Sequence, residues 1–306
     1  MQHFLSLWER SADELTQLIH RALTLKQQSN SGENASVLQG TNLALLFERS
    51  SLRTRVSFEI AMRQLGGNSL YLSGREIGWG ERESIPDIAR TLGNYVQGMV
   101  VRVNNYSSLR ELAQWSPIPV INGLTAYNHP CQAMADVLTL SEEFGGWQGL
   151  EVAYLGRSNQ DVARSLLFAA AKLGFCLTIS SPPAYTLDEE SLELARSLAG
   201  EGVVRRVDDP REAVKTADAL YTDVWISRGK TDEIEAGHRG RILAPYQVND
   251  GLLEAAPDRA IVMHCLPANR EQEITNSVAD SDRSRLFQQA ENRLHLHKAL
   301  LLQLLT

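Results

Sequence analysis

The 306-residue chain has few cysteines and no long apolar run. Its three cysteines, at positions 131, 176 and 265, are odd in number and widely spaced. They therefore do not form a disulfide framework, and they favour a reducing compartment. No stretch reaches the ~20 apolar residues that span a bilayer, and the first residues lack the cationic and apolar segments of a secretion signal. We expect a cytoplasmic protein that contacts no membrane.

Basic residues are also in the minority. The chain has 30 Lys and Arg against 37 Asp and Glu, for a net charge of -7. Nucleic-acid binding needs clustered cations, which a surplus of carboxylates opposes, so we expect no nucleic-acid partner. A length near 300 residues is about where one core stops growing and chains divide, which predicts two domains.

Short apolar runs alternate with polar loops and segments of helical periodicity along the chain. Few of these runs alternate apolar with polar residues, so they are typical of strands buried on both faces of a parallel sheet. The sequence therefore predicts an α/β fold. The runs are 43–47, 69–72, 99–103, 120–122, 152–155, 177–179, 219–221 and 261–264.

Helix signals predict where the chain divides. Ser11 and Glu14 form a capping-box pattern, which starts a helix at Ala12. A helical segment ends at Gly145-Gly146, and we place the domain boundary in this helix, at residues 133–147. The predicted domains are residues 1–132 and 148–285. An amphipathic helix at 286–306 is expected to pack back on the first domain.

Polar residues follow the apolar runs, at the strand ends where open parallel sheets bind ligands. Ser51, Arg53, Thr54 and Arg55 lie at the expected start of a helix, where hydroxyl, guanidinium and amide donors favour a phosphate. The segment lacks the glycines and lysine of a P-loop. A solvated basic loop with an ordinary Ser or Thr cap is the alternative. Arg102 ends another apolar run, either as a second anion contact or in an ion pair.

The next strand ends offer neutral and acidic groups. His129 and Gln132 could donate to a carbonyl oxygen and accept from an amide, although a histidine at a helix start is often only structural. The turn at 156–161 misses the dinucleotide-binding glycine pattern, so we reject that cofactor. Asp223 could bind an ammonium group or cap a turn.

His264 and Cys265 stand side by side in the sequence. Adjacent strand residues point to opposite faces, so this pair does not fit a catalytic Cys/His couple. A zinc site joining residues 129 and 131 with 264 and 265 would lack the Cys-x-x-Cys spacing, and a buried apolar cysteine is the other alternative. We expect no metal.

Five motifs occur in order along almost the whole chain. Together they resemble the aspartate/ornithine carbamoyltransferase family, in the branch that uses ornithine. Ser51-Leu52-Arg53-Thr54, within the segment 47–59, is similar to the family's carbamoyl-phosphate loop, usually Ser-Thr-Arg-Thr. The other four motifs are His129-Pro130-Cys131-Gln132, Thr222-Asp223-Val224-Trp225, His264-Cys265-Leu266-Pro267 and Ala290-Glu291-Asn292-Arg293.

The resemblance implies a fold and a reaction. The fold is two doubly wound parallel-sheet α/β domains with the active site in the cleft between them. The first domain would bind carbamoyl phosphate, and the second would bind L-ornithine. The carbamoyl group would move to the side-chain amine of ornithine, giving citrulline and phosphate in arginine biosynthesis, without a cofactor. The implied assembly is a homotrimer in which a loop around Gly78 to Arg82 completes the neighbouring site.

The resemblance also assigns roles to matching residues. The carbamoyl-phosphate contacts would be Ser51, Leu52, Arg53, Thr54, Gly78, Arg102, His129, Gln132, Cys265 and Arg293. Of these, the catalytic ones would be Arg53, Thr54, His129, Cys265 and Arg293. The ornithine contacts would be Asp161, Asp223, Ser227, Arg228 and Leu266.

Three positions depart from the family pattern. Gly78 stands where a Gln is common, Asp161 where an Asn is usual, and Arg228 where the family has Met. A carboxylate and a guanidinium read an amino-acid end differently from neutral groups. A sibling carbamoyltransferase with another amine acceptor, or a non-catalytic paralogue that binds carbamoyl phosphate, are therefore the alternative hypotheses.

Overall fold

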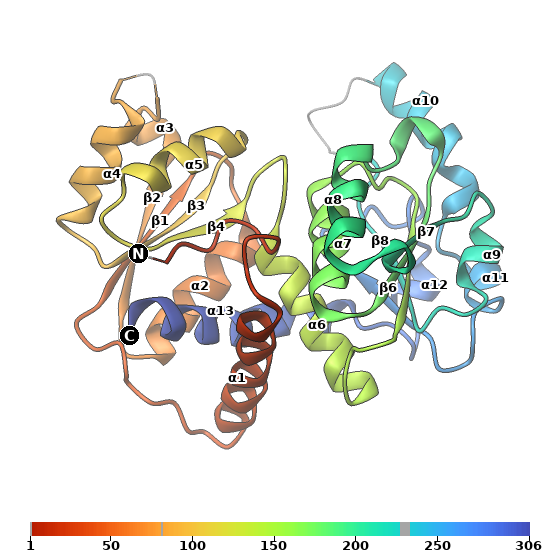
Figure 1. Ribbon diagram of the computed structural model, residues 1–306, viewed down its shortest axis with the longest axis horizontal. Coiled ribbons are helices and arrows are strands. Elements are labelled where there is room, and N and C mark those ends of the chain that lie inside the picture. Colours follow the sequence, from red (N-terminus) through yellow and green to blue (C-terminus); the bar gives the residue numbers. More distant parts are fainter. Residues whose placement is uncertain (1, 81, 227–232) are drawn as a thin grey trace. The chain divides into compact units, whose positions relative to one another are not determined.

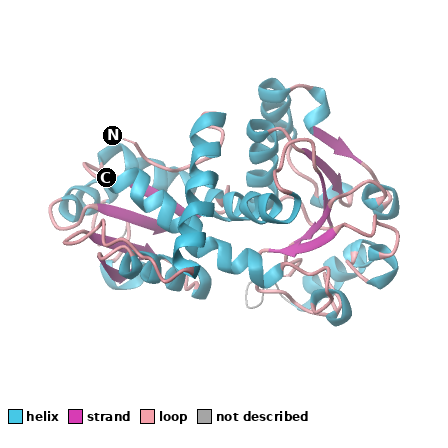
Figure 2. Cartoon of the chain, turned by 90° about the horizontal axis from the view of Figure 1, so that it is seen from below, coloured by secondary structure: helices cyan, strands magenta, loops and turns pink. Residues whose placement is uncertain are grey.

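The computed structural model describes residues 2–80, 82–226 and 233–306 (Figure 1). The chain forms two compact units. Unit 1 comprises residues up to Leu138 together with Glu291–Thr306, and unit 2 comprises Thr139–Ala290. Each unit holds one parallel sheet with helices on both sides (Figure 2). The predicted α/β class with two parallel-sheet domains is confirmed.

The sheet of unit 1 has the strand order β2-β1-β3-β4, and every pair is parallel. Phe47, the last residue of β1, is in register with Arg102, the last residue of β3. The edge strand β4 is covered by a bridge from Phe4 to Ile121. The strands are β1 (Asn42–Phe47), β2 (Asn68–Ser73), β3 (Gly98–Arg102) and β4 (Val120–Leu124).

Helices cover both faces of this sheet. On one face α4 (Ile85–Gly93) and α5 (Tyr106–Trp115) bury an apolar cluster with β1 and β3. On the other face lie α2 (Leu52–Gln64) and the end of α13 (Leu286–Leu305) (Figure 1). Unit 1 also contains α1 (Ala12–Asn30), whose predicted capping box is present, and α3 (Gly74–Ile77).

The sheet of unit 2 has the order β7-β6-β5-β8-β9, again all parallel. The sequence did not predict β7, because it is a three-residue edge strand that contains two exposed arginines instead of an apolar run. The strands are β5 (Glu151–Leu155), β6 (Cys176–Ser180), β7 (Val204–Arg206), β8 (Ala219–Thr222) and β9 (Ile261–His264).

Helices of 4 to 13 residues complete the described part of unit 2. One apolar cluster joins β5, β8 and β9 to α9, α11, α12 and the first turn of α13. None of the described helices is both long and apolar enough to cross a lipid bilayer. The helices are α7 (Asp161–Leu173), α8 (Glu189–Ala199), α9 (Pro210–Val214), α10 (Glu233–Leu243), α11 (Asp250–Leu253) and α12 (Asn276–Ala279), with 3-10 turns at Pro183–Tyr185, Glu201–Val203 and Ala244–Tyr246.

The boundaries differ in detail from those predicted at 133–147 and 286. The helix at the boundary is α6 (Pro130–Phe144), which begins earlier because Pro130 suits the first turn of a helix. The division into units falls inside α6, after Leu138, and inside α13, before Glu291. Residues 286–290 therefore belong to unit 2, and only the rest of the last helix belongs to unit 1.

Candidate active site

The strand order of each unit reverses once, which marks the expected ligand crevice. In unit 1 the reversal lies between β1 and β3, and in unit 2 between β5 and β8. Open parallel sheets bind ligands outside the carboxyl ends of the strands at such a switch point. The predicted site segments after β1 and β3, and after β5 and β8, begin at these strand ends.

The start of α2 carries the predicted phosphate-binding segment. Ser51 is its N-cap, and its Oγ accepts from the Thr54 amide at 3.4 Å. The first-turn amides of a helix have no carbonyl partners within the helix, so Leu52 and Arg53 begin an end of partial positive charge. The N-cap hydrogen bond therefore leaves other first-turn amides of α2 available to a ligand. Arg53 is partly buried here, and Thr54 is buried.

Arg55 does not join this group, contrary to the sequence-based expectation. Its Nε pairs with Glu59 Oε1 at 2.8 Å, and its guanidinium lies 3.9 Å from the centre of the Tyr71 ring. Both partners are partly buried. The reason is local, because Arg55 and Glu59 are one helical turn apart and face each other on α2.

A buried guanidinium links three helices of unit 1. Arg293 of α13 donates from Nη2 to Thr54 Oγ1 at 2.8 Å and from Nη1 to Gln132 Oε1 at 2.9 Å. Gln132 in turn donates to Asp136 Oδ1 at 2.8 Å. The starts of α2 and α6 are thus joined through one side chain of the last helix, and the predicted residues Thr54, Gln132 and Arg293 come together.

His129 precedes α6 and is buried among cations. Burial lowers the pKa of His129 well below its usual value, and the nearby Arg293, Arg102, His297 and Arg53 lower it further. The imidazole is therefore neutral at pH 7 and can donate one N–H to a carbonyl oxygen. Arg102, at the end of β3, donates from Nη1 to the Gly123 carbonyl at 3.4 Å. A neutral donor within a cationic setting suits an anionic ligand that carries a carbonyl group.

Several predicted residues of unit 2 lie near the buried hydroxyl of Tyr154 on β5. This buried phenol donates to the Arg157 carbonyl at 3.2 Å. Burial raises the pKa of Tyr154 well above its usual value, with further contributions from Asp223, Cys265 and Asp161. Those three predicted residues follow β8, β9 and β5 respectively, so unit 2 brings them to one place.

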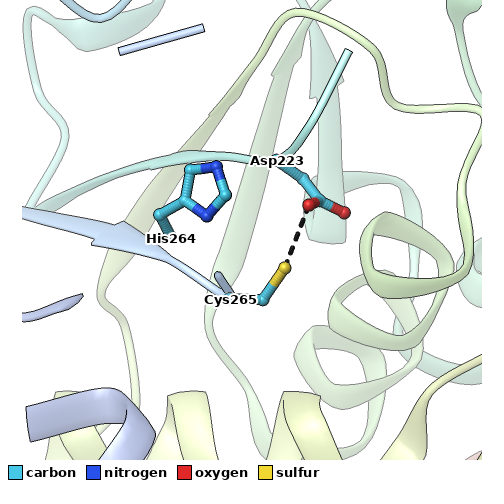
Figure 3. A group of neighbouring side chains, drawn as sticks. All are labelled: Asp223, His264 and Cys265. Carbon is cyan, nitrogen blue, oxygen red and sulfur yellow. Dashed lines mark hydrogen bonds between the residues drawn. The ribbon is translucent and has the colours of Figure 1, made fainter. Parts of the chain in front are cut away.

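Figure 3 shows the pair formed by Cys265 and Asp223. The Cys265 Sγ donates to Asp223 Oδ1 at 3.0 Å. The neighbouring His264 has other partners, since its Nδ1 accepts from the Leu266 amide at 2.8 Å and its Nε2 faces Glu273 Oε1 at 3.3 Å. These hydrogen bonds of His264 and Cys265 thus go to other residues, and the absence of a catalytic couple stays a prediction.

The same residues test the zinc alternative. Within the described residues, Asp223, His264 and Cys265 offer ligand atoms that all lie within 4.8 Å of one another. Both ring nitrogens of His264 already have hydrogen-bond partners, which removes its free lone pair. Burial raises the pKa of Cys131 to about 12, and its Sγ donates to the Asn122 carbonyl at 3.4 Å. The hydrogen bonds that already engage Cys131 and His264 do not fit zinc ligation.

Two more of the predicted site residues, Leu266 and Gly78, have a backbone with positive φ. Leu266 has φ +56°, in the left-handed region that is strained for a side-chain-bearing residue. Gly78 caps α3 with φ +65°, and a Cβ there would lie 2.6 Å from Arg82 Cβ. The side chain that the family often places at Gly78 is thus excluded by the turn. Ser227 and Arg228, the other predicted ornithine contacts, lie outside the described residues.

Two family models match the chain in succession. The first is the aspartate/ornithine carbamoyltransferase, carbamoyl-P binding domain, over residues 2–142. The second is the aspartate/ornithine carbamoyltransferase, Asp/Orn binding domain, over residues 148–304. The chain belongs to the aspartate/ornithine carbamoyltransferase family.

Similar proteins cover the whole length. The chain is 46% identical over 304 residues to an ornithine carbamoyltransferase of Anoxybacillus flavithermus, covering 99% of this chain and 96% of that protein. It is 44% identical over 305 residues to one of Archaeoglobus fulgidus, covering 100% and 98%. The solved ornithine carbamoyltransferase of Pyrococcus furiosus matches with a TM-score of 0.94 at 41% identity, covering 98% of this chain and 96% of that chain.

Some residues of the two crevices were missed from the sequence. Tyr154 lies in the apolar run 152–155, where nothing distinguishes it from a core residue. Arg157 lies in the turn that was rejected as a dinucleotide loop. Asp136 lies one turn beyond Gln132 on α6, and this spacing is the signal that would have found it.

Proposed function

We propose that the protein is an ornithine carbamoyltransferase, which transfers the carbamoyl group of carbamoyl phosphate to the side-chain amine of L-ornithine and releases citrulline and phosphate. The observation that carries this proposal is the neutral His129 set among Arg53, Arg102 and Arg293 next to the start of α2. This group of unit 1 offers cations for a phosphate and an uncharged donor for a carbonyl oxygen.

Unit 1 would hold carbamoyl phosphate. The phosphate is bound by Ser51, the Leu52 amide, Arg53, Thr54 and Arg102, where the helix terminus and the guanidinium groups favour negative charge. The carbamoyl group is bound by His129, Gln132 and Arg293. Thr54 Oγ1 accepts from Arg293, so its own hydroxyl hydrogen points elsewhere and can donate to the ligand.

The reaction passes through a tetrahedral oxyanion, which fixed donors stabilise. His129, Thr54 and Arg53 supply those donors, and Arg293 orients Thr54 from behind. When the bond to phosphate breaks, the leaving group gains charge that the arginines and the start of α2 compensate. The overall reaction is one transfer of an acyl group, the carbamoyl group, from phosphate to an amine. We therefore propose that no metal or organic cofactor takes part.

Unit 2 would hold the acceptor. An alkyl ammonium has a pKa near 10.4, so only about one molecule in a few thousand carries a neutral amine at pH 7. Asp223 and Asp161 would bind the α-ammonium of ornithine, and Cys265 fixes the carboxylate of Asp223. The strained Leu266 would direct its carbonyl to the attacking amine. Ser227 and Arg228 remain predicted contacts.

We further propose a homotrimer that acts in arginine biosynthesis in the cytoplasm, with the loop from Gly78 to Arg82 completing a neighbouring site. The support is the tight turn at Gly78, which leaves Arg82 exposed. Mixing two inactive variants, Arg82→Ala and Arg293→Met, tests this. Shared sites should restore part of the activity in mixed trimers, whereas independent sites would leave the mixture inactive.

Citrulline formation from carbamoyl phosphate and ornithine by the purified protein tests the main proposal. A panel of other amines should be assayed in parallel, because Asp161 stands where the family usually has Asn. Turnover only with another amine would make the protein a sibling carbamoyltransferase. Calorimetric binding of carbamoyl phosphate without turnover of any amine would make it a non-catalytic paralogue.

A further inference from the structure

Two arginines of unit 2 converge on a single carbonyl oxygen beside the proposed acceptor site. Arg157 and Arg239 each donate from Nη1 to the Trp225 carbonyl, both at 3.3 Å. The two Nη1 atoms are therefore at most twice 3.3 Å apart. One comes from the turn after β5, and the other comes from α10.

Like charges at this distance repel each other, so the arrangement calls for an anion. Burial lowers the pKa of Arg157, and Arg239 is the next contributor. Arg239 pairs with Glu235. Within the described residues, the hydrogen-bond acceptors of Arg157 are neutral, namely Trp225 O and Asn159 Oδ1, the latter at 3.1 Å. The positive charge of Arg157 thus has no carboxylate hydrogen-bonded to it in the described part of the chain.

The position of Arg157 connects it with the acceptor. It lies at the carboxyl end of β5, in the turn that leads to Asp161, and its peptide carbonyl accepts from Tyr154. The carboxylate of Asp223 also lies near enough to raise the pKa of Arg157. One crevice thus presents carboxylates and guanidinium groups together, which matches the α-ammonium and α-carboxylate of an amino acid.

We infer that Arg157 and Arg239 form a carboxylate-binding subsite, which recognises the α-carboxylate of the acceptor and selects an amino acid over a plain diamine. A guanidinium fork fits a carboxylate through two parallel hydrogen bonds. The inference rests on the proposed function, since it assigns a role within the same acceptor site. In the alternative, purely structural role, both arginines only hold the Trp225 backbone in place.

Two substrates separate these roles. L-Ornithine and 1,4-diaminobutane carry the same reacting amine, but only ornithine has the carboxylate. We expect Arg157→Gln to lower kcat/KM for ornithine by about ten- to a hundredfold, since a hydrogen bond to a charged group is lost. The value for 1,4-diaminobutane should change less than about threefold, so the preference for ornithine falls. If diaminobutane reacts too slowly, its inhibition constant against ornithine replaces kcat/KM.

Matched variants complete the test. Arg239→Gln should act like Arg157→Gln, and Arg157→Lys should retain part of the preference because the charge remains. Arg205→Gln is the control, since Arg205 of β7 pairs with Glu151 of β5 and lies outside the proposed site. An equal loss for both substrates, or no loss for either, would overturn the subsite. Wild-type protein that carbamoylates no amine would instead overturn the proposed function, and the subsite with it.

Discussion

Replacing Arg293 with methionine should separate ligand binding from folding. Arg293 is 3% exposed and donates to Thr54 and Gln132. Methionine has a similar length but no charge. The substitution leaves Gln132 Oε1 without this donor, at a cost of about 1–3 kcal/mol. It also removes the desolvation penalty of a buried guanidinium, which is several kcal/mol. We therefore expect the free energy of unfolding to change by less than about 2 kcal/mol.

Activity should respond much more strongly. Loss of a buried charge that faces an anionic ligand costs about 2–5 kcal/mol, which is roughly a thirtyfold to several-thousandfold loss in kcat/KM for carbamoyl phosphate. Steady-state citrulline formation gives this value, calorimetry gives the affinity for carbamoyl phosphate, and thermal unfolding gives the stability.

The same helix supplies a matched control. Lys298 is 1% exposed on α13, and its Nζ donates to Asn34 Oδ1 at 2.7 Å and Ser29 Oγ at 3.3 Å. Lys298→Met also removes a buried cation from α13, yet it should leave the KM for carbamoyl phosphate unchanged. If both variants lost activity equally, the effect would come from the helix as a whole. Wild-type kinetics in Arg293→Met would refute the assignment directly.

Three further predictions concern pH, a thiol and a turn. Burial lowers the pKa of His129 and His297, so protons favour the unfolded chain. The free energy of unfolding should therefore fall below about pH 6.5, by about 1.4 kcal/mol per pH unit for each histidine, and His297→Leu should reduce this slope in chemical unfolding. Cys265→Ala should raise the KM for ornithine about tenfold, and Cys265→Ser should restore most of it, because a donor to Asp223 returns. Gly78→Ala should raise the KM for carbamoyl phosphate more than Gly80→Ala, because both have positive φ but only Gly78 faces Arg82; equal effects would contradict this.

The sequence predicts most of the fold because parallel strands are buried on both faces and so stand out as apolar runs. It also predicts which segments meet, since the carboxyl ends of parallel strands share one edge of the sheet. The strand β7 escapes this reasoning because Arg205 and Arg206 occupy an exposed edge. The sequence-based prediction wrongly included Arg55 in the phosphate-binding group after β1. Arg55 and Glu59 are four residues apart on a helix, and this spacing predicts the ion pair that the structure shows.

Contacts made by single side chains were harder to predict. Tyr154 resembles any core aromatic in the sequence, yet its hydroxyl donates to the Arg157 carbonyl and lies near Asp223 and Cys265. Arg239 lies in α10, far along the chain from Arg157, and no local pattern connects them. Their meeting depends on how β5 and β8 are ordered in the sheet, which a single sequence does not state.

The division of the chain has a consequence for its synthesis. Unit 2 is one continuous stretch, but unit 1 is completed by residues 291–306, which are synthesised after the whole of unit 2. Unit 2 can therefore fold before Arg293 has been synthesised. Arg293 is the residue of unit 1 that joins α2 to α6. A chain released before residue 291 would lack this link, so tight binding of carbamoyl phosphate would mark only molecules whose translation has passed Arg293.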